Sequence, residues 1–111
     1  GGPTRAVCLF SMERILALQK EGHPIQPGTT GENLTIQGLD WNLMKVGAKF
    51  QIGEAKIELT GPAPPCKTIS ESFEKGEFVR ISEKTYPGWS RWYASVSKEG
   101  IVAINDIISE I

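Results

Sequence analysis

Glycine and proline punctuate this chain at intervals of roughly ten residues, and this spacing constrains the fold more than any other feature. The twelve glycines and seven prolines are spread along all 111 residues and form no linker. Short segments between regularly spaced turns are typical of an all-β or β-rich fold. The turn signals are Pro27-Gly28, Gly31, Gly38, Gly47, Gly53, Gly61-Pro62, Gly76, Pro87-Gly88 and Gly100.

The composition allows one domain of an ordinary soluble type. Hydrophobic residues make up 40% of the chain and charged residues 23%. The net charge of −1 argues against a nucleic-acid partner, because nucleic-acid binders carry a basic excess. No apolar run approaches the roughly 18 residues that cross a bilayer, and residues 1–5 lack the layout of a signal peptide. We therefore expect a cytoplasmic protein with neither a nucleic-acid nor a membrane partner.

The amino-terminal third of the chain predicts a strand, a helix and a second strand. The apolar run 6–10 is typical of a buried strand. Ser11 has the character of a helix N-cap, and the apolar spacing after it predicts a helix over residues 12–21 that stops at Gly22. Residues 33–36 predict the second strand.

The rest of the chain predicts a hairpin, a short helix and three closing segments. Residues 49–52 and 55–60 alternate polar and apolar side chains around Gly53-Glu54, which predicts a β-hairpin. Proline lacks an N–H donor, so residues 61–65 are expected to end the ladder. Residues 66–75 predict a loop and a short helix. The closing segments are expected at 92–97, 100–104 and 106–111, with the first two paired as a hairpin.

Cys66 is the strongest candidate for chemistry. It follows three prolines within four positions and precedes the predicted short helix, with Lys67 and Thr68 in the first turn. A thiol in such a place has a depressed pKa, and its thiolate can act as a nucleophile, a sulfur carrier or a soft metal ligand. The alternative is a small buried apolar residue in a loop. Cys8 lies within a predicted strand and is expected to pack in the core.

Several other residues carry weaker signals. Two cysteines are too few for a disulfide scaffold, and reduced thiols fit better than a bridge between Cys8 and Cys66. His23 could pair with Cys66, or it could be an exposed loop histidine. The chain has no Cys-x-x-Cys or His-Glu-x-x-His motif, so we do not expect a structural zinc site.

Two further groups of residues could bind a ligand. The turn Gly31-Glu32-Asn33 could bind an anion through its backbone amides, with Asn33 orienting the ligand, or it could be a plain turn. Trp89, Trp92 and Tyr93 surround Arg91, and they are expected either to form a stacking platform or to pack in the core.

Taken together, motifs spread over nearly the whole chain resemble those of the MOSC domain. This domain is found at the carboxyl end of molybdenum cofactor sulfurases, and alone in many bacterial proteins. The motifs are Gly1-Gly2-Pro3-x-Arg5-Ala6-Val7, Gly31-Glu32-Asn33-Leu34-Thr35, Gly38-Leu39, Lys45-Val46-Gly47, Ile57-Glu58-Leu59-Thr60, Pro65-Cys66, Trp92-Tyr93-x-x-Val96, Gly100-Ile101-Val102 and Asp106-x-Ile108.

The resemblance implies a mostly-β, closed and strongly bent β-barrel-like fold with a few short helices. Residues 1–111 would form a single domain that lacks the amino-terminal strand or strands of the family. Three residues depart from the pattern: Ala63 stands where the family often has arginine, Arg91 follows the place where another arginine is usual, and Asn105 replaces a glycine.

The resemblance also implies which residues would form the site. Cys66 matches the family's cysteine, which would ligate the molybdenum of the pterin cofactor or carry sulfur. The residues expected around it in the cofactor pocket are Gly31, Glu32, Asn33 and Thr35. Arg91 or Lys67 would substitute for the missing arginines in holding the cofactor phosphate.

We therefore predict a molybdenum-cofactor-binding protein. The resemblance implies that such a protein either reduces N-hydroxylated substrates, with electrons from a donor protein, or handles cofactor sulfur. Two alternatives stay open at this point. One is a non-catalytic MOSC-fold binding module. The other is sulfur transfer through a Cys66 persulfide, supplied by a sulfur-donor protein, with no pyridoxal phosphate expected in this chain. A homodimer that covers an open sheet edge is a further expectation.

Overall fold

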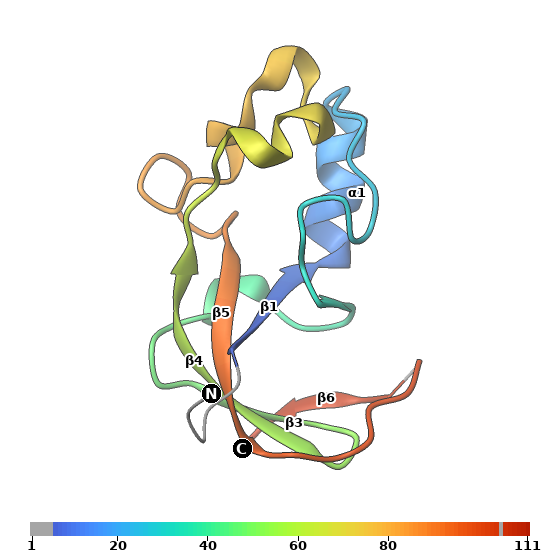
Figure 1. The fold of residues 1–111 in the computed structure, drawn as a ribbon, viewed down its shortest axis with the longest axis vertical. Coiled ribbons are helices and arrows are strands. Elements are labelled where there is room, and N and C mark those ends of the chain that lie inside the picture. The colour runs from blue at the N-terminus through green and yellow to red at the C-terminus, as the bar shows by residue number, and fades with distance from the viewer. Residues whose placement is uncertain (1–5, 105) are drawn as a thin grey trace.

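The computed structural model describes residues 6–104 and 106–111, and strands of one bent sheet form most of it (Figure 1). The six strands follow the order β2-β1-β5-β4-β3-β6 across the sheet. The strands are β1 (Ala6–Ser11), β2 (Leu34–Ile36), β3 (Lys49–Ile52), β4 (Ala55–Ala63), β5 (Arg91–Lys98) and β6 (Ile108–Glu110). The helical elements are the α-helix α1 (Met12–Lys20) and the 3₁₀ helices η1 (Trp41–Leu43), η2 (Lys67–Ser72), η3 (Glu74–Gly76) and η4 (Phe78–Ile81).

The sheet forms a half-barrel. β3 and β6 lie across one end of the molecule, and α1 and the 3₁₀ helices η2, η3 and η4 gather at the other (Figure 1). β1 and β2 pair in parallel, and the other paired strands are antiparallel. The predicted mostly-β, strongly bent fold with a few short helices is confirmed. Within the described residues no pairing joins the edge strands β2 and β6, so the barrel is open on that side.

Alternation along β3 and β4 places their apolar side chains inside the half-barrel. Phe50 in β3 and Ile57 and Leu59 in β4 are buried, whereas the residues between them are less covered. Trp92 and Ala94 of β5 add to the same core. Burying each large apolar side chain stabilises the fold by about 1.5–3 kcal/mol, so this face fixes the strand register.

The helix α1 begins and ends as its sequence predicts. The Ser11 hydroxyl accepts a hydrogen bond from the Arg14 amide at 3.1 Å, which caps the amino terminus. Ile15 and Leu18 are buried on one face. The chain leaves the helix at Gly22, whose φ of +101° favours glycine.

The strand β4 runs further than the prolines predict. It continues through Gly61 and Pro62 to Ala63, with Pro62 opposite Trp92 of β5, so the expected end of the ladder before residue 61 is wrong. The pairing with β3 stops at Glu58, Leu59 still exchanges hydrogen bonds with Gly47 and Ala48, and from Gly61 onward the described pairing is with β5 alone. Proline is tolerated there because its missing N–H can face the unpaired side.

The predicted hairpin between residues 92–97 and 100–104 is also wrong. The chain leaves β5 and crosses to β6, which pairs with β3. On the way Ile101 exchanges hydrogen bonds with Glu54 in the β3–β4 turn, and the Asp106 carboxylate accepts a bond from the Ala103 amide. These separate hydrogen bonds stand where the predicted hairpin would have a β-ladder, and after β5 a strand forms only at Ile108–Glu110.

The opening between β2 and β6 is hollow and mainly apolar. A cavity of about 400 Å³ lies inside the half-barrel, lined among others by Val7, Leu34, Ile52 and Val96. A second hollow of about 680 Å³ lies between β2 and residues 102–104 and 106–108. The assignment of residues 1–111 to a domain that lacks the family's amino-terminal strands stays a prediction.

No helix within residues 6–104 and 106–111 is long and apolar enough to span a membrane. The motif residues 1–5 and Asn105 lie outside the described residues.

Candidate functional site

Arg91 joins the two sequence motifs that are expected to form the site. It is the first residue of β5, and only 7% of its surface is exposed. Its Nη1 donates to the Thr30 carbonyl at 2.6 Å, and its Nη2 donates to the Pro64 carbonyl at 3.1 Å. The guanidinium therefore connects the loop that carries Gly31 to the segment that leads into Cys66.

The strand register explains how Arg91 reaches this place. Arg91 is the direct partner of Ala63 across the β4–β5 ladder, and Ala63 is fully buried. Side chains of direct partners lie on the same face, about 5 Å apart at Cβ, so the small alanine leaves room for the guanidinium. An arginine on β5 thus lies beside the position where the resemblance expects one on β4.

The positively charged guanidinium of Arg91 is hydrogen-bonded to uncharged carbonyl oxygens. No carboxylate lies within ion-pair distance of it in the part of the chain that the structure describes. Its Nε is buried, and no described residue accepts a hydrogen bond from it. A buried cation without a paired anion is costly, so both carbonyl bonds contribute to keeping Arg91 in place.

Glu32 braces the neighbouring loop from inside. Its carboxylate accepts hydrogen bonds from the Thr30 hydroxyl at 2.7 Å, the Gly28 amide at 2.9 Å and the Thr35 hydroxyl at 3.0 Å. The side chain is 8% exposed. Glu32 and Thr35, both predicted to surround the cofactor, are thus brought together, and they shape the loop that presents the Thr30 carbonyl to Arg91.

Asn33 and Gly31 hold the same loop against β1. Asn33 bonds to both backbone polar groups of Cys8. The backbone N–H of Asn33 donates to the Cys8 carbonyl, and the side-chain Oδ1 accepts from the Cys8 backbone N–H, each at 2.8 Å. Gly31 has a φ of +79°, and its amide donates to the Gly28 carbonyl. The amides of residues 28, 29, 31 and 33 are therefore engaged within the protein.

Cys66 is exposed at the start of the 3₁₀ helix η2. Its Sγ lies 2.8 Å from the Thr68 hydroxyl. The hydroxyl and the backbone amide of Thr68 lower the pKa of the Cys66 thiol, and the charge of Arg91 lowers it further. The predicted short helix is found as η2, and the activation of the thiol stays a prediction. Lys67, the next residue in the chain, is exposed, but the groups that lower the pKa of Cys66 are Thr68 and Arg91.

Cys8 contrasts with Cys66, although both thiols are free. Cys8 is 6% exposed, as its place in a strand predicts. Burial raises the pKa of its thiol, Arg91 opposes this effect, and Glu32 adds to it. The chain therefore offers one buried, protonated thiol and one exposed thiol that ionises more readily.

Two contributors to the site were missed by the sequence analysis. Thr30 supplies both a hydroxyl to Glu32 and a carbonyl to Arg91, and nothing in its sequence context indicates these roles. Thr68 supplies the hydroxyl beside Cys66. A hydroxyl two residues after a candidate thiolate is a signal that could have been used, because side chains at this spacing can bond in a turn.

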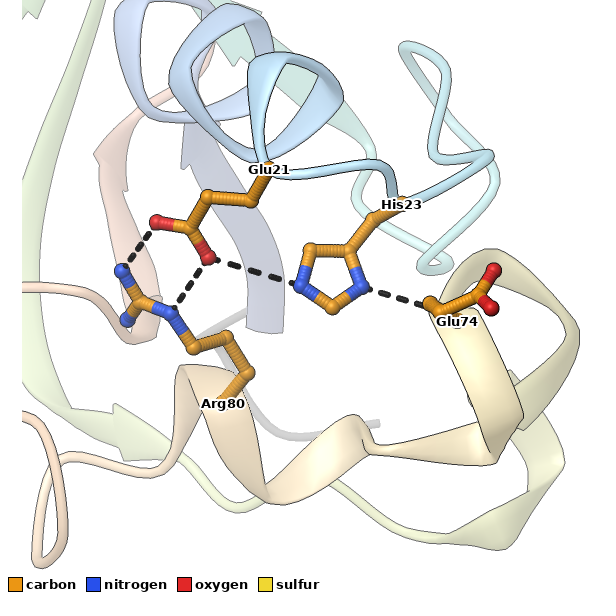
Figure 2. Close-up of polar contacts among 4 residues, drawn as sticks. All are labelled: Glu21, His23, Glu74 and Arg80. Atoms are coloured by element: carbon orange, nitrogen blue, oxygen red, sulfur yellow. Dashed lines mark hydrogen bonds and ion pairs between the residues drawn. The ribbon is translucent and has the colours of Figure 1, made fainter.

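His23 is neither an exposed loop histidine nor a partner of Cys66 in the described contacts. It is 8% exposed, and its Nδ1 accepts a hydrogen bond from the Glu74 amide at 3.0 Å (Figure 2). Its Nε2 lies 3.5 Å from the Glu21 carboxylate, which also binds Arg80 through two hydrogen bonds. The ring packs edge-on against Phe73. His23 therefore links the end of α1 to η3.

The three aromatic residues around Arg91 do not form one platform. Trp92 is buried in the core, whereas Tyr93 is 42% exposed, because neighbouring residues of a strand point to opposite faces. Trp89 packs against the guanidinium groups of Arg14 and Arg80. The stacking platform considered from the sequence is therefore not assembled.

The described residues hold no group of three or more His, Cys, Asp or Glu side chains that could bind a metal ion by themselves. A metal at this site would therefore need ligands from a cofactor in addition to Cys66.

Comparison with known proteins identifies the family. Residues 1–109 match the family model of the MOSC domain. The chain belongs to the MOSC domain family. It is 31% identical over 104 residues to the uncharacterized protein YflK of Bacillus subtilis (strain 168), covering 93% of this chain and 46% of YflK. It is 32% identical over 108 residues to the protein YiiM of Escherichia coli (strain K12), covering 93% of this chain and 47% of YiiM.

Solved structures of MOSC relatives share the fold. The crystal structure of YiiM from Geobacillus stearothermophilus matches with a TM-score of 0.75 at 20% identity, over 100% of this chain and 62% of that one. YiiM from Escherichia coli matches with a TM-score of 0.74 at 28% identity, over 99% of this chain and 56% of that one. The MOSC chain described here spans about half the length of the curated relatives that it matches.

The brace formed by Glu32 predicts a stability loss on substitution. Glu32→Gln keeps the size of the side chain but turns one acceptor oxygen into a donor, which leaves buried groups unpaired. We expect the free energy of unfolding in urea to fall by about 1–3 kcal/mol. Glu110→Gln, at an exposed position of β6, is the matched control and should change little. Equal stability of Glu32→Gln and the parent would contradict the brace.

The two thiols should react at different rates. At neutral pH iodoacetamide should modify Cys66 faster than Cys8, on the order of tenfold or more, because Cys66 is exposed and has the lower pKa. Thr68→Val removes the hydroxyl, so the pH at which Cys66 is half-reactive should rise. Mass spectrometry of timed reactions measures both effects. Similar rates for the two thiols, or an unshifted pH profile in Thr68→Val, would argue against an activated Cys66.

Proposed function

We propose that this MOSC domain binds the molybdenum cofactor, with Cys66 as the protein's ligand to molybdenum. The observation that carries the proposal is an exposed cysteine with a lowered thiol pKa, in a segment held by a buried arginine. MOSC domains are associated with this cofactor, which agrees with the proposal. A thiolate is a ligand that soft and redox-active metals accept.

The residues that we assign to holding such a group next to Cys66 are Lys67 and the loop that carries Gly31. A Cβ added at Gly31 would meet nothing within 4 Å, so the backbone there is open. Lys67 follows Cys66 directly in the chain and is exposed, and it is the residue that we assign to the cofactor phosphate. The guanidinium of Arg91 stays behind the site, bonded to carbonyl groups.

The bound cofactor would supply two-electron redox chemistry at molybdenum. The chain's own contribution is to lower the pKa of the Cys66 thiol, through the Thr68 hydroxyl and amide, and to fix the position of the sulfur. The substrate class that we propose is N-hydroxylated bases. Their reduction takes up two electrons and two protons, breaks the N–O bond and releases water. The electrons would come from a donor protein.

Metal content tests this proposal directly. The full chain, expressed in a host that makes the cofactor, should retain molybdenum after purification, as measured by inductively coupled plasma mass spectrometry. Cys66→Ser should lose it, because serine is a poor ligand for soft metals. Cys8→Ala is the matched control and should keep the metal. The absence of molybdenum from the parent chain, or equal content in Cys66→Ser, would refute the assignment.

Sulfur transfer is a second candidate, favoured by the exposure of Cys66 and its lowered thiol pKa. The Cys66 thiolate would attack the outer sulfur of a donor persulfide, form Cys66–S–SH and release the donor thiolate. After incubation with a cysteine desulfurase charged with sulfur, mass spectrometry should find one added sulfur atom on Cys66 and none on Cys8. An unmodified Cys66 would exclude this function, and if molybdenum were also absent a non-catalytic binding module would remain.

A further inference from the structure

We infer that Arg91 is a positioning residue for Cys66: it ties the segment before this cysteine to the loop that carries Gly31, and it does not contact the bound ligand itself. The inference deepens the proposed function, on which its relevance to the cofactor rests. Its test uses the protein without cofactor, so the two can fail separately.

Cys66 lies within a segment that is attached to the loop on both sides. Before the cysteine, Arg91 connects the Pro64 carbonyl to the Thr30 carbonyl. After it, the Ser72 hydroxyl donates to Thr29, at 2.9 Å to the hydroxyl and 3.3 Å to the carbonyl. Ile69 also anchors this segment in the core, so removing either link would leave the segment attached to the loop at one end only.

The shape of the guanidinium suits this task better than that of a lysine. Arginine carries donors in a fixed planar fork, and two of its nitrogens here reach acceptors 61 and 27 residues away in the sequence. An ammonium group has the same charge but no such fork. Lysine at this position should therefore keep the charge near Cys66 and fail to hold both segments.

The burial of Arg91 distinguishes a positioning residue from a residue that contacts the ligand. Arg91 is 7% exposed, both of its Nη atoms are bonded to carbonyl groups, and its Nε is buried. The hydrogen bonds of Arg91 therefore go to the protein backbone, as expected of a side chain that holds two segments together. The groups acting on Cys66 are thus the Thr68 hydroxyl and amide on η2 and the Arg91 guanidinium on β5.

Two substitutions and a matched control test the inference. Arg91→Met removes the charge and the donors at similar size, and Arg91→Lys removes the fork alone. Arg80→Met removes another largely covered arginine, which binds Glu21 and has no hydrogen bond to residues 64–72 among the described bonds. The readouts are the pH profile of Cys66 alkylation and amide hydrogen exchange in residues 27–33 and 64–72.

In Arg91→Met we expect the alkylation profile to shift to higher pH and exchange in both segments to accelerate. In Arg91→Lys the profile should stay close to that of the parent, while exchange accelerates. Arg80→Met should leave both readouts at the site unchanged. A parent-like exchange pattern in Arg91→Lys overturns the inference, and so does an equal profile shift in Arg80→Met. If Arg91→Met does not fold, the exchange comparison between Arg91→Lys and Arg80→Met decides.

Discussion

The buried guanidinium of Arg91 is the interaction on which the arrangement of the site depends. Within the described residues it has no carboxylate partner, so its position is set by the two carbonyl groups that it binds. Because those carbonyls belong to Thr30 and Pro64, one side chain fixes the distance between the Gly31 loop and the approach to Cys66. The strands of the half-barrel position Arg91, and its two hydrogen bonds hold the Gly31 loop and the Cys66 segment in place relative to each other.

Glu32 and Arg91 have opposite charges and complementary tasks. The Glu32 carboxylate accepts hydrogen bonds from Gly28, Thr30 and Thr35 in its own loop, which keeps the Thr30 carbonyl in place. Arg91 then connects this loop to the segment before Cys66. Because Glu32 binds groups of its own loop, it is nearly fully buried, although it was expected to surround a cofactor. Gly31 and Lys67, by contrast, are exposed.

Local signals predicted the local structure well. The Ser11 cap and the alternation around Gly53-Glu54 identified the helix and the hairpin, because these elements depend on near neighbours in the chain. The extension of β4 through Pro62 could not be seen, since it depends on β5 and on the absence of β3 at that point. His23 was misjudged for the same reason: Phe73 and Glu74, about fifty residues away in the sequence, bury it. The role of Arg91 likewise depends on residues far along the chain.

X-ray absorption at the molybdenum edge, on the full chain purified from a host that makes the cofactor, tests the central claim most directly. If Cys66 is the protein ligand, the spectrum should contain one molybdenum–sulfur distance in addition to those from the pterin, and Cys66→Ser should remove it. A spectrum that is the same in the parent and in Cys66→Ser would show that molybdenum is not held by this sulfur, and the account of the site would be wrong.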